Sequence, residues 1–173
     1  MAQDQPSLPL LWLLSDERND AGLEEALRAL PSGSGFVFRH YHLDPASRRE
    51  RFDELAAIAH GRGHTVILSG DGDWGADGCY GQRGIGLYLA TAHDGDELQE
   101  AVAEGADGIF LSPVFPTASH PGAQTLGPHG FSVLAQQSPV PVIALGGMTR
   151  ERAEAFGIIR WGAIDGLGST KVA

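Results

Sequence analysis

The chain has 173 residues, of which 42% are hydrophobic and 20% charged, enough for one domain with a buried core but short for two. Its net charge of −10 would repel a polyanion, so we expect no nucleic-acid partner. The uninterrupted apolar runs are far shorter than a membrane span, so we expect no membrane insertion.

A single cysteine, Cys79, excludes an intrachain disulfide and any cysteine-based metal cluster. The first ten residues, MAQDQPSLPL, lack the basic region and long apolar core of a signal peptide. We therefore expect a cytoplasmic protein whose residues 1–173 form one domain, with residues 1–7 as a disordered tail.

The first part of the chain contains three strand patterns and two helix patterns. The apolar run Leu8–Leu14 is continuous, which is typical of a strand buried on both faces, and Phe36–Tyr41 and Thr65–Leu68 predict two more strands. Asp20 is the predicted cap of the first helix, and Asp44-Pro45 is a strong start for the second. The apolar faces of these helices are predicted to carry Leu23, Ala26, Leu27 and Leu30 in the first, and Phe52, Leu55, Ala56 and Ala59 in the second.

The rest of the chain predicts five further strands. The segment GDGDWGADG after the third strand is too short and too rich in glycine for a full helix. Later helices are predicted to begin at Asp94 or Asp96, to span Gly130–Gln136, and to be capped by Thr149. The five strands are predicted over Cys79–Tyr80, Ile85–Ala90, Ile109–Leu111, Val140–Leu145 and Ile158–Ile164.

Eight strands that alternate with helices or their remnants indicate a TIM (β/α)8 barrel. Such barrels usually need about 250 residues, so this compact one would have shortened or missing helices after strands three, four and eight. A doubly wound open sheet is the alternative, and the count of eight strands favours the barrel. The motif Gly-Ala-Asp-Gly, at 75–78 and again at 105–108, supports a repeat of about 30 residues, the size of one βα unit.

In a TIM barrel, ligands bind past the carboxyl ends of the strands, and phosphate favours the loops after strands seven and eight. Gly146 and Gly147 follow strand seven, where two glycines let backbone N–H groups approach an anion. The alternative is a turn that needs glycine for positive φ and binds no ligand. Thr117 and Ser119 offer hydroxyls to a ligand in the proline-rich loop after strand six. The alternative interpretation is a surface loop that binds no ligand.

Several charged side chains are further candidates. Arg39 either extends to solvent at the end of strand two or points into the barrel mouth at a phosphate. Asp71 could hold Mg²⁺ through carboxylate oxygens, although its GDGD turn needs no metal to form.

Histidines are spread along the chain without the spacing of a metal site. His40 and His42, two residues apart, should face one side, and two surface histidines are a commoner explanation than a metal pair. His93 follows strand five and His120 lies after strand six, so either could meet a ligand in the barrel mouth.

The segments GADGIFLSPVFPTASHPGA and PVPVIALGGM strongly resemble the thiamine phosphate synthase and thiazole tautomerase (TenI-like) family. That family has a Gly-Ala-Asp strand entry, a Pro-Val-Phe-Pro-Thr loop and an Ala-x-Gly-Gly phosphate turn. LWLLSDER is similar to the end of its first strand. The resemblance implies a TIM barrel, in agreement with the strand count.

The resemblance also implies an activity. It points to a transferase that joins hydroxymethyl-pyrimidine pyrophosphate to thiazole phosphate and releases pyrophosphate, with Mg²⁺ and small phosphorylated ligands. By the same resemblance, phosphate would bind at Thr117, Ser119, Gly146 and Gly147, and Arg39 would contact the pyrophosphate. The alternatives are a thiazole tautomerase-like isomerase that uses His93 or His120 as acid/base, and a non-catalytic barrel that binds a thiamine-pathway phosphate.

The chain departs from the family pattern at several strand ends. The second strand of the family ends in Gln-x-Arg-Glu-Lys, whereas VFRHY here keeps only Arg39, and the acid after strand four is absent. Asp165 stands where a phosphate-binding serine belongs, unless Gly168-Ser169 takes that place; Pro113 replaces the tautomerase histidine. Shortened helices would expose apolar barrel wall, which makes a homodimer possible.

Overall fold

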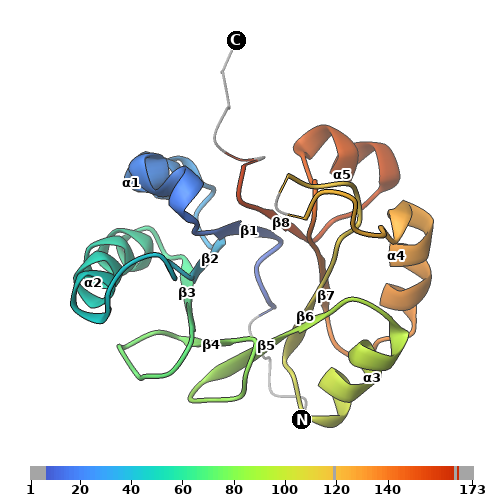
Figure 1. Ribbon diagram of the computed structural model, residues 1–173, viewed down its shortest axis with the longest axis horizontal. Helices are drawn as coiled ribbons and strands as arrows, with labels where there is room; N and C mark the ends of the chain where they lie inside the picture. The colour runs from blue at the N-terminus through green and yellow to red at the C-terminus, as the bar shows by residue number, and fades with distance from the viewer. Residues whose placement is uncertain (1–6, 119, 166, 168–173) are drawn as a thin grey trace.

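A computed structural model of the chain describes residues 7–118, 120–165 and 167. It is a closed barrel of eight parallel strands that pair in sequence order, β1 with β2 and so on until β8 returns to β1 (Figure 1). The predicted barrel is confirmed, and the open-sheet alternative is excluded. The strands are β1 (Leu11–Leu14), β2 (Gly35–Phe38), β3 (Thr65–Ser69), β4 (Gly78–Tyr80), β5 (Leu87–Ala92), β6 (Gly108–Leu111), β7 (Val142–Ala144) and β8 (Trp161–Ala163).

The helices cover the barrel unevenly. Figure 1 shows α1 and α2 outside one side of the barrel and α3, α4 and α5 outside the other. In the described chain no helix follows β3 or β4, as expected from the sequence, and the residues after β8 lie mostly outside the described part. The helices are η1 (Glu17–Gly22, a 3-10 helix), α1 (Leu23–Ala29), α2 (Pro45–Gly61), α3 (Gly95–Ala103), α4 (Gly127–Gln136) and α5 (Arg150–Phe156).

The interior of the barrel is filled by large apolar side chains around Trp12. Its ring meets Phe110 edge to face, with centroids 5.5 Å apart, and its indole N–H donates to the Pro9 carbonyl. A Cβ on Gly35 would lie 2.2 Å from the Trp12 ring, so β2 can pass the indole only with glycine there. The barrel is therefore a packed core rather than an open channel.

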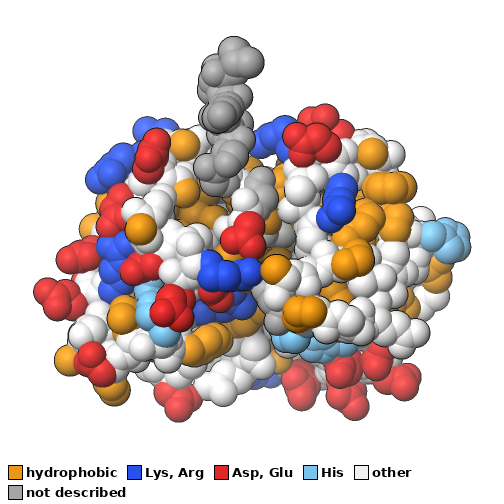
Figure 2. Space-filling view, turned by 45° about the horizontal axis from the view of Figure 1, so that its top comes forward, with side chains coloured by type: hydrophobic (Ala, Val, Ile, Leu, Met, Phe, Trp, Pro, Cys, Tyr) orange, Lys and Arg blue, Asp and Glu red, His pale blue; other side chains and the backbone are white. Residues whose placement is uncertain are grey.

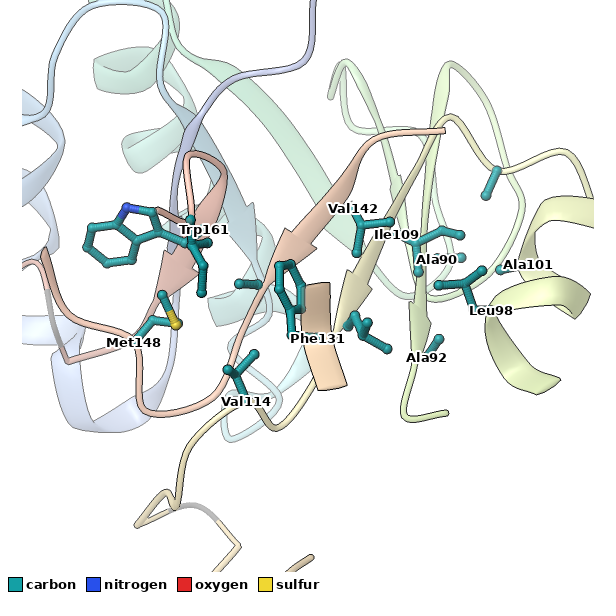
Figure 3. Packing of buried hydrophobic residues seen from close by; sticks show 14 of the residues in the cluster. Ala90, Ala92, Leu98, Ala101, Ile109, Val114, Phe131, Val142, Met148 and Trp161 are labelled. Atoms are coloured by element: carbon teal, nitrogen blue, oxygen red, sulfur yellow. The ribbon is translucent and has the colours of Figure 1, made fainter. Parts of the chain in front are cut away.

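Two further apolar clusters join the barrel to its helices. One lies between β1–β3 and helices α1 and α2, and the other between β5–β8 and helices α3 to α5. Figure 3 shows Leu98 of α3 and Phe131 of α4 within the second cluster, beside Ile109 and Val142 of the strands. Most of these helices are short, and their buried faces pack against the strands and hold them in place.

The two Gly-Ala-Asp-Gly segments form the same clamp at the amino-terminal ends of the strands. Asp77 donates its backbone N–H to the Val66 carbonyl and accepts the Val66 N–H through its carboxylate, each at 2.7 Å. Asp107 repeats both hydrogen bonds with Tyr88, each at 2.8 Å. The sequence repeat is thus a structural device on the side of the barrel opposite the strand carboxyl ends.

Asp20 does not cap a helix, so that prediction is wrong. Asp16 caps η1 instead, accepting from the Arg18 N–H, while α1 follows η1 directly and needs no side-chain cap. The Asp20 carboxylate is bound by Arg51 and lies beside His40. Asp44, Asp94 and Thr149 do cap helices, as predicted.

The limits of two strands differ from the prediction. The strand predicted over Phe36–Tyr41 ends at Phe38, so Arg39 lies just beyond it. The strand predicted over Ile85–Ala90 shifts to Leu87–Ala92, and Ile85 is exposed. Residues 1–6 of the predicted tail lie outside the described residues. None of the described helices is long and apolar enough to cross a membrane.

Candidate functional site

A cavity of about 740 Å³ opens at the carboxyl ends of the strands. Residues at or just after the end of every strand line it, from Arg18 in the β1 loop to Asp165 after β8. Its size lies within the range of about 300–1,000 Å³ that is usual for small-molecule sites. Closure of the barrel therefore brings eight separate loops around one ligand-sized space.

Gly146 and Gly147 form one wall of this cavity, as predicted. Both have positive φ, 101° and 60°, and a Cβ on either would come within 2.7 Å of the backbone of the β6–α4 loop. Within the described chain their N–H groups donate no backbone hydrogen bond, although the Gly146 carbonyl accepts from Phe115. The turn therefore leaves two adjacent amides available to an anion.

Thr117 joins this wall through the β6–α4 loop. It lines the cavity, and its hydroxyl accepts the backbone N–H of His120 at 3.1 Å. The loop is fixed to the glycine turn because Val114 N–H donates to the Leu145 carbonyl. Ser119, the other predicted hydroxyl, lies outside the described residues.

Arg39 points into the barrel mouth and lines the cavity. Its Nε donates to the Ser15 carbonyl at 3.0 Å, and its Nη2 lies 3.4 Å from the Asp16 carboxylate. Burial raises the pKa of the neighbouring Tyr80 phenol, and the Arg39 charge opposes that rise. The guanidinium is held in one orientation by the β1 loop, with Tyr80 kept neutral beside it.

Two histidines, His93 after β5 and His120 in the β6–α4 loop, line the cavity. His93 Nδ1 lies 2.9 Å from the Glu97 carboxylate, and the same carboxylate accepts the His93 backbone N–H. His120 lines the cavity from the β6–α4 loop. The His93–Glu97 pair has the form of an oriented acid/base group at the rim.

Asp71 does not line the cavity directly. It is exposed, and its carboxylate accepts from the Gln82 amide at 2.7 Å. Gln82 itself is part of the cavity wall. The Gln82 side chain therefore lies between Asp71 and the cavity that the other described candidate residues line.

Asp165 lies in the cavity wall and is paired with Arg18. Arg18 Nη1 is 3.3 Å from the Asp165 carboxylate, and Arg18 Nε is 3.2 Å from Asp16. An arginine from the first loop thus offsets the negative charge that Asp165 brings to the wall. Gly168 and Ser169 lie outside the described residues.

The expectation of two surface histidines at 40 and 42 is wrong for His40, which is buried beneath the β1 and β2 loops. Its Nδ1 lies 2.8 Å from the Ser15 hydroxyl and its Nε2 lies 2.6 Å from the Asp20 carboxylate. This resembles a Ser-His-Asp series, but Ser15 is fully buried and does not line the cavity. The series is a structural network that supports Arg39, whose backbone N–H donates to Ser15.

Sequence reasoning missed a group that shapes the β2–β4 side of the cavity. Tyr41 and Tyr80 line it, and the Tyr41 hydroxyl is hydrogen-bonded to the Ser69 hydroxyl. Arg48 of α2 donates to the Arg39 carbonyl at 2.9 Å and to the Ser69 carbonyl, which ties the ends of β2 and β3 together. Arg48 lies in an ordinary helical position, so nothing in the sequence around it indicated this role.

The face drawn in Figure 2 carries no continuous basic patch of the kind that binds a polyanion. Figure 2 shows acidic and basic side chains mixed over one face of the molecule instead of a basic stripe. The net charge of −10 points the same way. A phosphate would depend on local amides and arginines.

Comparisons with known proteins agree with this arrangement. Residues 81–163 match the family model described as thiamine monophosphate synthase. A thiamine-phosphate synthase of Chlorobium luteolum is 30% identical over 171 residues, 87% of this chain and 79% of that protein. A putative thiamine-phosphate synthase 2 of Aquifex aeolicus is 44% identical over 62 residues, and the matched part is 36% of this chain and only 33% of that relative.

A solved structure shares the fold. Thiamine phosphate pyrophosphorylase from Pyrococcus furiosus superposes with a TM-score of 0.78, covering 95% of this chain and 90% of that one. The sequences are 20% identical, so this similarity concerns the architecture.

The contact between the glycine turn and the β6–α4 loop predicts unequal effects of two alanine substitutions. Gly147 and Gly157 have almost the same φ, 60° and 65°, but only Gly147 would bring a Cβ against neighbouring atoms. Gly157→Ala should cost about 1–2 kcal/mol of unfolding free energy for left-handed backbone strain. Gly147→Ala should cost about 1–3 kcal/mol more because of the contact with Pro116. Urea denaturation measures both, and equal losses would show that the loop does not pack against the turn.

Proposed function

This chain belongs to the thiamine monophosphate synthase and TenI family, and from that premise we propose that it joins hydroxymethyl-pyrimidine pyrophosphate to thiazole phosphate and releases pyrophosphate. The observation that carries the proposal is the pair of available amides at Gly146 and Gly147, set in the wall of a ligand-sized cavity. Backbone N–H groups of a glycine turn are a common phosphate site.

The thiazole phosphate would bind at the Gly146–Gly147 turn. Thr117, in the loop held against that turn, would donate its hydroxyl to a phosphate oxygen, and Ser119 is proposed to do the same. The prolines of this loop reduce the entropy lost when it is ordered around a ligand. The phosphate would thereby fix the thiazole ring within the cavity.

Arg39 would bind the pyrophosphate of the second substrate. Its guanidinium is oriented by Ser15 and Asp16, which leaves little rearrangement for the reaction. As the bond between the pyrimidine methylene carbon and the pyrophosphate oxygen breaks, the leaving group keeps the electron pair and its negative charge is stabilised by Arg39. The thiazole nitrogen then donates its lone pair to the methylene carbon, and the new C–N bond completes thiamine phosphate.

Mg²⁺ would bind together with the pyrophosphate at the edge of this cavity. Such ions are usually bound by one or two carboxylates together with substrate phosphate oxygens. Asp71 would be the protein ligand, because its carboxylate is exposed and its partner Gln82 already lies in the cavity wall. The ion would supply positive charge to the departing pyrophosphate.

A second candidate function, a thiazole tautomerase-like isomerase, is favoured by the His93–Glu97 pair. Glu97 would orient His93 so that the imidazole exchanges a proton with a ligand in the cavity. His120 is the other candidate for this role. Binding of a thiamine-pathway phosphate without turnover is the third possibility, because the family's strand-two lysine and strand-four acid are absent.

We also propose that the protein forms a homodimer and works in the cytoplasm. Exposed apolar side chains, including Phe156 and Ile159 at the end of α5, would support a homodimer. A reducing cytoplasm suits a chain with one cysteine, whose pKa is raised by burial.

The transferase predicts product formation from the two purified substrates. With Mg²⁺ present, thiamine phosphate and pyrophosphate should appear in equal amounts, and His93→Gln should leave the rate within about twofold because no proton transfer limits it. Product chromatography measures both. No product, with thermal stabilisation by thiazole phosphate, would favour the binding function; no stabilisation by any phosphorylated ligand would contradict all three.

The Arg18–Asp165 pair predicts a gain in phosphate affinity on removal of the acid. Asp165→Ser should bind thiazole phosphate about two- to fivefold more tightly, since interactions of exposed charges are worth up to about 1 kcal/mol. Asp53→Ser is the matched control, because it removes the same charge from the outer face of α2. Calorimetry compares them, and equal affinity in both variants would place the phosphate away from Asp165.

A further inference from the structure

A cluster of metal-binding side chains lies beside the cavity, on the outer side of the β1 and β2 loops. Asp20, His40 and His42 each present a possible ligand atom, and these atoms lie within 4.8 Å of one another. Asp20 comes from η1, whereas the two histidines follow β2. None of the three lines the cavity, so the cluster is separate from the proposed phosphate site.

The cluster is held in place before any ion binds. The His40 ring is stacked on Phe38, with centroids 4.6 Å apart, and the His42 ring lies 5.0 Å from it on a tilted plane. His40 is buried, Asp20 is partly exposed and His42 is exposed, so an ion can enter from solvent by moving the His42 ring. His40 and Asp20 are therefore already side by side, and binding would order the exposed His42 ring.

The neighbouring groups orient the ligands as outer-shell partners do in metal sites. The Ser15 hydroxyl lies 2.8 Å from His40 Nδ1 and can accept a hydrogen bond from Nδ1–H, in the tautomer that would leave Nε2 free for a metal. Arg51 donates to Asp20 Oδ1 at 2.8 Å, which fixes the carboxylate.

The local charge also favours a cation. Arg51 is surrounded by three carboxylates, those of Asp20, Glu24 and Glu54. With neutral histidines this group carries a formal charge of −2, which a divalent ion would cancel. The cost of placing an ion near the Arg51 guanidinium is therefore offset by Glu24 and Glu54.

We propose that Asp20, His40 and His42 form a binding site for a divalent transition-metal ion of the zinc type. Two imidazole nitrogens and one carboxylate oxygen suit Zn²⁺ and Co²⁺ better than Mg²⁺, which prefers oxygen ligands alone. Binding replaces the direct His40–Asp20 contact with two bonds to the metal and leaves a further position for water. The ion joins η1 to the loop after β2, and Ser15 connects this site to Arg39 of the cavity.

The test uses the full chain, freed of any affinity tag and of metal, and titrated with Co²⁺ alone. We expect one Co²⁺ per chain with a visible absorption band of a site of low coordination number, displaced by Zn²⁺ and retained in excess Mg²⁺. Since loss of an outer-shell partner already costs about 10- to 100-fold in affinity, His42→Ala and Asp20→Asn should weaken binding by at least about tenfold. His42 is exposed, so His42→Ala should fold normally.

His129→Ala is the matched control, because His129 is also exposed but lies on α4. Its Co²⁺ affinity should equal that of the unaltered chain. Absence of one-to-one binding, equal affinity in His42→Ala and His129→Ala, or displacement of Co²⁺ by Mg²⁺ would each overturn the proposal. None of these readouts depends on the transferase activity.

Discussion

Closure of the barrel around Trp12 is the constraint on which the rest of the structure depends. The indole fills the interior at β1, and β2 accepts it because Gly35 has no side chain there, while Gly162 of β8 packs against the Trp12 Cβ and Leu14. With so few helices outside, a filled interior is what keeps eight strands in one closed sheet. Only a closed sheet directs all eight carboxyl ends at the same cavity.

The two halves of the cavity are built differently. On the β6–β7 side, backbone packing between Gly146–Gly147 and the β6–α4 loop creates the site, and side-chain chemistry contributes little. On the β1–β4 side, Arg39, Tyr80 and Tyr41 depend on a supporting layer that includes Ser15 and Arg48. The departures from the family pattern after strands two and four lie on this second side. There the buried Ser15 and the neighbouring Asp16 fix the orientation of Arg39.

The sequence predicted the strand count, most helix caps and the glycine turn because each depends on local residues. Asp44-Pro45 and Thr149 cap helices through bonds to residues two or three positions ahead, so their roles are visible in short segments. His40 was misjudged because its partners, Ser15 and Asp20, are at least 20 residues away in sequence. Arg48 was missed for the same reason, since it acts on the ends of two strands that only the closed sheet brings together.

The central claim is that the amides of Gly146 and Gly147 bind the phosphate of a thiamine-pathway ligand. A crystal structure of the chain with thiamine phosphate tests it most directly. We predict a phosphate oxygen within hydrogen-bond distance, about 2.7–3.2 Å, of both amide nitrogens, with the Thr117 hydroxyl also in contact. A phosphate bound on the Arg39 side of the cavity, with the glycine amides facing only water, would contradict the account.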